Sequence, residues 1–308
     1  MIDKLKKYLF NYTFIEELTP GNESFNTNLK LRRNLNKSLW VGKIFRPLSY
    51  KIEDFYDKGK HYICNVDFQD LEHRAIFGFR LAKVIGLKSL KFKTIQLNKL
   101  SNFDPNTIKH DRINNNVFLT KLKGVSLTQY LSSNSFETFE SSDIINKDEA
   151  IFSFVFNLWI GNYDNKDEDF LVDEDKNLIS IDYQVLGPGF RDNPKLSLGA
   201  WGESFDINDP RDTGWCIGDG KLLDYLRNSI NRWEIFKKAI EKINSLPEKK
   251  IKLAMKGLNF YNQGTKKNIN DLFYSFLLER RTKLEKIIKD WIRADCPIVD
   301  LPKDNGVK

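Results

Sequence analysis

Apolar residues form two kinds of pattern along this chain, short runs and a helical spacing. Around 38–45 and 116–122 they form short runs rich in β-branched and aromatic residues, which is typical of strands. Between 67 and 86 they recur every three or four residues, which predicts a helix with Asp67 as N-cap and Gly86 just beyond its end. Similar reasoning predicts a short helix over 3–18, a strand beginning near Leu29 or Leu31, and a strand over 88–98.

The second half of the chain has a mainly helical pattern. Residues 148–160 are apolar almost all round, so this helix should be buried. Two short apolar runs flank the polar turn 173–177 and predict a tight hairpin. From Lys221 onwards the apolar positions again have helical spacing. A break at 245–247 precedes two more helices, the last over 269–293.

A change of pattern near residue 124 divides the chain. The strand over 116–122 runs into Gly124, and Ser126 can then cap a short helix. Such a crossing suits a hinge between a small β-rich region and a larger helical region. The predicted fold class is therefore α+β, with antiparallel strands in an N-terminal part over 1–123, a helical part over 124–295 and a surface tail over 296–308.

Composition limits the class of protein and the residue types available for catalysis. The 308 residues are 41% hydrophobic and 13% aromatic, enough for a sizeable core, and no run reaches the length of a membrane span. The formal net charge of +7 is interleaved with acids, which indicates a solvated lysine-rich surface rather than a nucleic-acid partner. Three cysteines without a C-x-x-C pair favour reduced thiols, and a cytoplasmic protein is the simplest interpretation. With only three histidines, catalysis would depend on carboxylates and lysines.

Three aspartates lie around the predicted hairpin. Asp164 follows the buried helix, Asp169 lies five residues later, and Asp182 follows the second hairpin strand. An acidic loop by itself is more often a solvated turn. A kinase, however, needs an acid beside the attacking hydroxyl and oxygen ligands for magnesium. The spacing of Asp164 and Asp169 is that of the kinase catalytic loop D-x-x-x-x-N, with Asp in the last position.

Candidate phosphate-binding residues precede this region. Gly21 and Ser24 lie in a polar loop whose backbone N–H groups could cover phosphates, and Lys43 on a strand could reach the same phosphates. Glu72, in the early turns of the predicted helix, could pair with Lys43. Each residue alone has a simpler explanation, as a solvent-facing lysine or a glutamate that favours the positive end of a helix. Their order relative to the aspartates is what favours a nucleotide site.

The order of these motifs resembles the protein-kinase-like superfamily, in its HipA-like and phosphatidylinositol 3- and 4-kinase-like branch. That branch shows N-x-D-[RD]-x-x-x-N and then an I-D dipeptide where other kinases carry D-F-G. This chain has Asn162-Tyr163-Asp164 with Asp169, and then Ile181-Asp182-Tyr183. The segment 276–284 also resembles the closing helix of HipA-like proteins.

The resemblance implies a two-lobed kinase-like fold with ATP and Mg²⁺, or Mn²⁺, as cofactors. The reaction it implies is transfer of the ATP γ-phosphate to a hydroxyl. A protein Ser/Thr acceptor is the first choice, because HipA-like members phosphorylate proteins. By position, Asp164 would be the catalytic aspartate, Lys43 would hold the α and β phosphates, Glu72 would orient Lys43, Gly21 and Ser24 would contact phosphates, and Asp169 and Asp182 would bind the metal.

Two departures from the family pattern keep alternatives open. Asp169 replaces the expected Asn, and Asn165 stands where a charged residue is expected. One alternative is a catalytically impaired, nucleotide-binding pseudokinase that acts as a regulator or scaffold. Another is a kinase that acts on a lipid headgroup or a small alcohol.

Overall fold

A computed structural model gives the fold of the chain. It describes residues 12–18, 26–45, 48–53, 61–66, 68–104, 116–121, 123–162, 167–183, 221–227, 232–261 and 266–295. The predicted site residues Gly21, Ser24 and Asp164, and the predicted tail over 296–308, lie outside these ranges.

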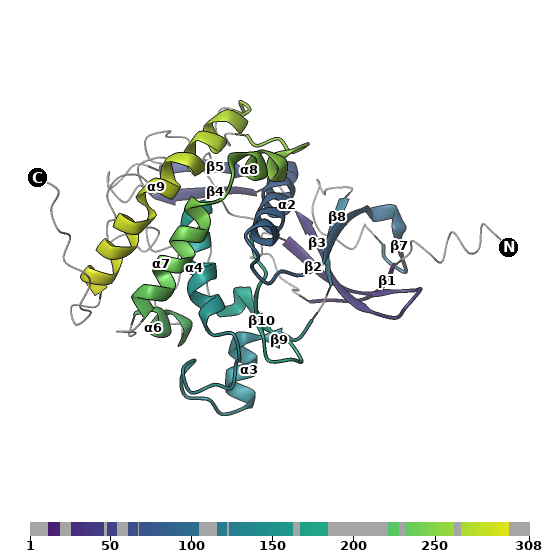
Figure 1. The fold of residues 1–308 in the computed structure, drawn as a ribbon. Coiled ribbons are helices and arrows are strands. Elements are labelled where there is room, and N and C mark those ends of the chain that lie inside the picture. The colour runs from purple at the N-terminus through teal and green to yellow at the C-terminus, as the bar shows by residue number, and fades with distance from the viewer. Residues whose placement is uncertain are drawn as a thin grey trace, which may run out of the picture.

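A curved six-stranded sheet dominates the N-terminal part (Figure 1). Its strand order is β6-β8-β3-β2-β1-β7, and every neighbouring pair is antiparallel except β1 with β7. β4 and β5 pair with each other in a separate antiparallel ribbon. The strands are β1 (Tyr12–Glu17), β2 (Asn26–Arg33), β3 (Leu39–Phe45), β4 (Leu48–Glu53), β5 (His61–Val66), β6 (Phe92–Gln96), β7 (Leu100–Ser101) and β8 (Asn116–Lys121), with a 3₁₀ turn at Leu97–Lys99.

The two faces of this sheet contact different cores. Lys43 lies opposite Phe118 in the pairing of β3 with β8, so their side chains share one face of the sheet. On that face Phe118 packs against Phe79 of helix α2 (Phe68–Val84), with ring centroids 5.5 Å apart. The sheet therefore presents Lys43 on the side that α2 covers. The opposite face carries a smaller cluster of its own, made of Tyr12, Leu29, Leu31, Trp40, Ile44, Leu97, Val117 and Leu119.

The C-terminal part is mainly helical, with one small sheet (Figure 1). Helix α4 is buried on nearly all sides and packs against α7 and α9. The small sheet has the order β11-β10-β9 and contacts α3 and α4. Its elements and the helices are β9 (Val125–Ser126), α3 (Leu127–Ser133), α4 (Asp148–Ile160), a 3₁₀ turn at Asp167–Asp169, β10 (Phe170–Val172), β11 (Leu178–Ser180), α6 (Lys221–Arg227), α7 (Trp233–Asn244), α8 (Glu248–Met255) and α9 (Asn270–Asp295).

The predicted α+β class is confirmed, because an antiparallel-rich sheet precedes a helical region. The local signals also hold. Ser126 accepts a bond from the backbone N–H of Gln129 and caps α3, and Gly86 after α2 has a φ of +77°. Among the described helices, none combines the length and apolarity needed to cross a bilayer. The division of the chain at residue 123 stays a prediction.

The predicted helix over 3–18 is wrong where the structure describes it. Residues Tyr12–Glu17 form β1, which pairs with β2 on one side and β7 on the other. The irregular apolar spacing that suggested a helix ends in Tyr12-Thr13-Phe14-Ile15, a run of residue types that favour strands. Pairing with two neighbours satisfies this backbone in a way that local propensity does not reveal. The ribbon of β4 and β5 was not predicted either.

Candidate active site

The hairpin of β10 and β11 brings two of the predicted aspartates to its open end. Phe170 lies opposite Ser180, and one step further the backbone N–H of Ile181 donates to the carbonyl of Asp169 at 2.9 Å. Asp182 is therefore the next residue beyond the paired ends. The Asp169 residue is buried, while Asp182 keeps some access to solvent. The predicted metal-binding pair is thus assembled by one short hairpin.

Lys43 reaches this hairpin from the six-stranded sheet. Its Nζ lies 2.8 Å from Oδ2 of Asp182, although 139 residues separate the two in sequence. The side chains are 15% and 16% exposed, so the pair is largely shielded but open to solvent on one side. An ion pair in this setting is stronger than one at the surface, and its groups can still exchange partners. The sheet and the hairpin therefore meet at a charged contact between two predicted site residues.

Glu72 has a different partner from the one expected. Its buried carboxylate accepts a hydrogen bond from the Asn116 side-chain amide, with Nδ2 3.1 Å from Oε2. Asn116 lies on β8 two residues before Phe118, the residue opposite Lys43, so Asn116 shares the face of Lys43. Within the described residues, Lys43 pairs with Asp182 in place of the predicted Glu72. Glu72 nevertheless lies against the same face of the sheet.

Asn162 connects the end of α4 to the loop that carries Asp182. The helix ends at Gly161, whose φ of +65° and ψ of +46° place it in the left-handed region. The N–H of Asn162 then donates to the carbonyl of Asn157 at 2.9 Å, and its side-chain amide donates to the carbonyl of Asp182 at 3.0 Å. Asn162 is the last described residue before Asp164. It is buried, and it holds the segment that begins the predicted catalytic loop against the segment that carries Asp182.

The end of α4 is itself fixed by α9. The indole Nε1 of Trp159 donates to the carbonyl of Leu277 at 2.9 Å. Arg280, also buried, donates from its Nε to the carbonyl of Leu158. The carbonyl of Leu158 belongs to the last turn of α4 and also accepts from the N–H of Gly161 at 3.3 Å, so Arg280 adds a second donor there. A buried guanidinium thus stabilises the helix end that precedes the predicted catalytic loop.

The predicted hinge is bonded directly to the hairpin turn. Lys123 Nζ lies 2.5 Å from Oδ2 of Asp173, whose Oδ1 accepts the backbone N–H groups of Asp175 and Asn177. These bonds outweigh the effect of burial and lower the pKa of Asp173 to about 2. Gly124 has a φ of +84°, and a Cβ there would come within 1.9 Å of the Val172 carbonyl oxygen. Only glycine fits where the chain at residue 124 passes β10.

A second charged group joins α2 to the helical part. Asp70 and Arg74 are fully buried and paired, with Arg74 Nε 2.6 Å from Oδ2 of Asp70. The Tyr261 backbone completes the group, because its N–H donates to Asp70 and its carbonyl accepts from Arg74. The guanidinium also lies 5.9 Å from the ring centroid of Phe260 and 5.7 Å from that of Phe273. Burial raises the pKa of the Asp70 carboxyl, and the charge of Arg74 opposes that rise.

The donor set at the open end of the hairpin suits Mg²⁺. In proteins this ion is commonly held by one or two carboxylates, with phosphates and water completing an oxygen shell. Asp169 and Asp182 provide two carboxylates, and Lys43 provides a cation beside them. Within the described part of the chain, no group of three or more His, Cys, Asp and Glu side chains forms a complete metal cage. Two carboxylates beside a lysine could take part in binding a metal together with phosphate oxygens.

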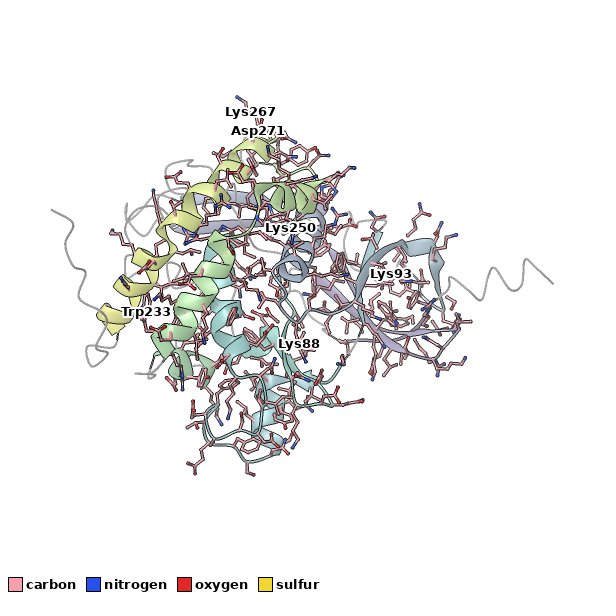
Figure 2. The ribbon with its side chains drawn as sticks, viewed as in Figure 1. Lys88, Lys93, Trp233, Lys250, Lys267 and Asp271 are labelled. Carbon is pink, nitrogen blue, oxygen red and sulfur yellow. The ribbon has the colours of Figure 1, made fainter. Side chains whose placement is uncertain are left out.

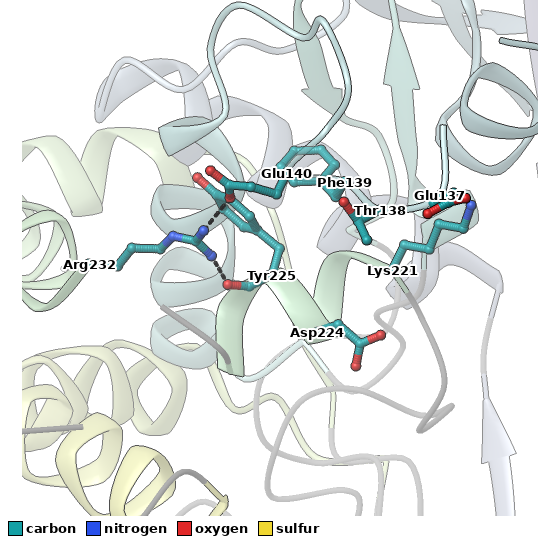
Figure 3. A pocket seen from close by; sticks show the side chains of 8 residues that line it. All are labelled: Glu137, Thr138, Phe139, Glu140, Lys221, Asp224, Tyr225 and Arg232. Carbon is teal, nitrogen blue, oxygen red and sulfur yellow. Dashed lines mark hydrogen bonds and ion pairs between the residues drawn. The ribbon is translucent and has the colours of Figure 1, made fainter. Parts of the chain in front are cut away.

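A separate surface pocket of about 210 Å³ lies next to α6 (Figure 3). Arg232 crosses it, stacks over the ring of Tyr225 and bonds to the Glu140 carboxylate and to the Tyr225 carbonyl. Its described lining includes none of the predicted catalytic or nucleotide-binding residues. The lining residues are Glu137, Thr138, Phe139, Glu140, Lys221, Asp224, Tyr225 and Arg232.

Comparison with known proteins adds a likeness of fold. No protein-family model and no curated protein matches the chain. Among solved structures, a proinflammatory kinase from Helicobacter pylori, CtkA, is similar over 95% of this chain and 99% of its own, with 12% identity and a TM-score of 0.44. A similarity at this level does not define function, which has to be argued from the side chains of the site.

Several residues of the site were not predicted from sequence. Nothing in the sequence marked Asn116 as a site residue, because an asparagine at the start of a strand is common. Asp70 and Arg74 carried a partial signal, since an acid and a base four residues apart on a helix can pair, but only the structure shows that this pair is buried. Asn162 stands in the quoted N-x-D motif, yet its bond to the Asp182 carbonyl depends on how the hairpin folds back.

Proposed function

We propose that this protein is an ATP-dependent kinase that transfers the γ-phosphate of ATP to a hydroxyl group. The observation that carries the proposal is the contact of Lys43 with Asp182. A lysine from the sheet and an aspartate beyond the hairpin meet at 2.8 Å, and a second carboxylate, Asp169, lies one hairpin step away. Phosphoryl transfer needs such a set: a cation for the phosphates and carboxylates for the metal that accompanies them.

The residues would divide the work as follows. Asp182 and Asp169 would hold Mg²⁺ or Mn²⁺, which neutralises charge on the triphosphate when bound. Lys43 would leave Asp182 for the α and β phosphates, because the metal takes over that carboxylate. Asp164 would orient the acceptor hydroxyl and accept its proton as the new oxygen–phosphorus bond forms and the bond to ADP breaks. Glu72 and Asn116 would support the face from which Lys43 projects.

A protein Ser/Thr hydroxyl is the acceptor we favour, on the family resemblance of the motifs alone. Incubation with ATP and either Mg²⁺ or Mn²⁺, followed by intact-mass measurement, should show added phosphate on the protein itself or on an added protein substrate. The Asp164→Ala variant should lose this addition. Its binding of ATP, measured as a rise in melting temperature, should persist because Lys43 and Asp182 are unchanged.

The presence of Asp169 in place of Asn favours a second candidate, a nucleotide-binding protein without transferase activity. A further carboxylate adds negative charge beside the triphosphate and makes binding depend more strongly on the metal. Thermal stabilisation by ATP with metal, combined with no mass increase and no ADP release, would identify this case. ATP that fails to stabilise the protein with either metal would contradict both candidates.

A further inference from the structure

Helix α8 exposes a lysine-rich face on the helical part. Lys249, Lys252 and Lys256 follow each other at spacings of three and four residues, which places them on one side of the helix. Lys250 lies on the neighbouring side, and all four side chains are exposed. The opposite side of α8 is buried. The segment 248–271 contains six lysines against two acidic residues. Figure 2 labels Lys250 on this helix, and Lys267 and Asp271 near the start of α9.

The acid of α8 is already engaged within the protein. Glu248 accepts a hydrogen bond from Tyr274 at 2.7 Å and lies 3.5 Å from Arg281, both on α9. The negative charge of Glu248 is therefore balanced by Arg281 of α9, and it does little to balance the positive charge of the exposed lysines of α8. The ammonium group of Lys252 lies over the ring of Tyr274 on α9, with Nζ 4.9 Å from the centroid, so this side chain is also held by α9.

The face is also held rigidly. Arg80 of α2 donates to the carbonyls of Ala254 and Lys256, at 3.2 and 2.9 Å, where the last carbonyls of α8 need partners. Anchored by α9 at its start and by α2 at its end, α8 presents its lysines without having to order itself on binding. A preorganised charged face loses less entropy when a partner arrives.

An exposed leucine stands among these lysines. Leu253 is 63% exposed and lies about one turn from both Lys249 and Lys256. Of the large hydrophobic side chains that the described structure exposes, all are aliphatic. Single-stranded nucleic acids are bound largely by stacking on aromatic rings. An anionic bilayer surface instead attracts lysines to its headgroups and accepts an aliphatic side chain at the acyl boundary.

We propose that the α8 face, made of Lys249, Lys250, Lys252, Leu253 and Lys256, binds the surface of an anionic lipid bilayer. The ammonium groups of Lys249, Lys250 and Lys256 contact phosphate and carboxylate groups of the headgroups, Lys252 adds its charge from its place over Tyr274, and Leu253 enters between the headgroups. Contact of this kind is peripheral and reversible. It does not depend on the kinase proposal, because α8 shares no residue with the candidate active site.

The test is co-sedimentation of the full chain with vesicles at about physiological ionic strength. Phosphatidylcholine vesicles are compared with vesicles that also contain phosphatidylserine. Wild type should bind the anionic vesicles and leave the neutral ones. The Lys249→Gln/Lys250→Gln/Lys256→Gln variant should lose about a hundredfold in partitioning, because each lysine near an anionic surface contributes substantially. Leu253→Gln should lose about threefold.

The matched control removes the same charge elsewhere. Lys91→Gln/Lys99→Gln/Lys121→Gln changes three exposed lysines of the N-terminal part and should reduce partitioning by no more than about threefold. Equal losses in the two triple variants would overturn the proposal, since general net charge would then explain binding. Absence of binding to anionic vesicles would also overturn it. Binding to duplex DNA without binding to the anionic vesicles would overturn the proposal as well.

Discussion

Two charged pairs take part in contacts between the N-terminal part and the C-terminal part, and they differ in burial and in partners. Asp70 and Arg74 are fully buried, bonded to the Tyr261 backbone and enclosed by aromatic rings. Lys43 and Asp182 form a partly open pair, 15% and 16% exposed. The first pair lies within α2 and binds the backbone of Tyr261, in the segment between α8 and α9. The second connects the two predicted site segments.

The difference separates a structural link from an exchangeable one. A fully buried pair cannot lose a partner without leaving a desolvated charge, so it holds α2 in one position. A pair with access to solvent can exchange its partner for a ligand of the same charge at small cost. We therefore expect the α2 link and the hinge to set the geometry, while Lys43 and Asp182 respond to phosphate and metal.

The largest effect should come from removing Arg74. Arg74→Met leaves the Asp70 carboxylate buried without its cation and should lower the free energy of unfolding by about 3–5 kcal/mol. Urea unfolding measures this loss. Lys30→Ala, which breaks the exposed pair with Glu16, is the control and should change stability by less than about 1 kcal/mol. The double variant Asp70→Asn/Arg74→Met should recover part of the loss. If Arg74→Met and Lys30→Ala lost the same free energy of unfolding, the structural role of Arg74 would be contradicted.

The hinge should be the next most sensitive point. Gly124→Ala places a Cβ against the Val172 carbonyl as well as forcing alanine into a positive φ. It should lower the free energy of unfolding by about 3 kcal/mol. Gly257→Ala is a matched control, because Gly257 also has a positive φ, +76°, but nothing lies within 4 Å of its Cβ position. That variant should lose only about 1 kcal/mol. Equal losses would show that the close approach to β10 has no consequence.

Asp173 should make the hinge sensitive to acid. Because the pKa of Asp173 is lowered to about 2 in the folded protein, its stabilisation is complete above its ordinary value. That stabilisation is lost as the pH falls through about 2. Asp173→Asn should therefore lose about 2 kcal/mol at neutral pH and little at the acid end. Chemical unfolding across the pH range checks this, with Glu174→Gln in the same turn as control. A constant difference at every pH would rule out the carboxylate as the cause.

The smallest effect on stability should come from the exchangeable pair. Lys43→Met should change the free energy of unfolding by about 1 kcal/mol, because the Asp182 side chain keeps access to water. The same variant should abolish the thermal stabilisation by ATP and Mg²⁺, which wild type and Lys30→Ala should retain. A stability loss as large as that of Arg74→Met would show that this link is structural instead.

Local patterns predicted much of the fold and of the candidate site. The spacing around 67–86, the buried run at 148–160 and the turn at 173–177 indicated α2, α4 and the hairpin, because each depends on contacts within a few residues. The segment Tyr12–Glu17 shows where such reasoning fails. It pairs with β2, the next strand along the chain, and with β7, which lies far along the chain, and these backbone partners decided that it would be a strand.

The sequence by itself determined which residues could do the chemistry: one strand lysine and the carboxylates placed around a hairpin. It also predicted the hairpin around which these aspartates lie, and the pairing of β10 with β11 in the structure brings Asp169 and Asp182 to its open end. Only the tertiary structure decided that Lys43 meets Asp182, while Glu72 bonds to Asn116. Those partners depend on how a sheet and a helix pack against a distant hairpin, and residue spacing carries no information about contacts over 139 positions.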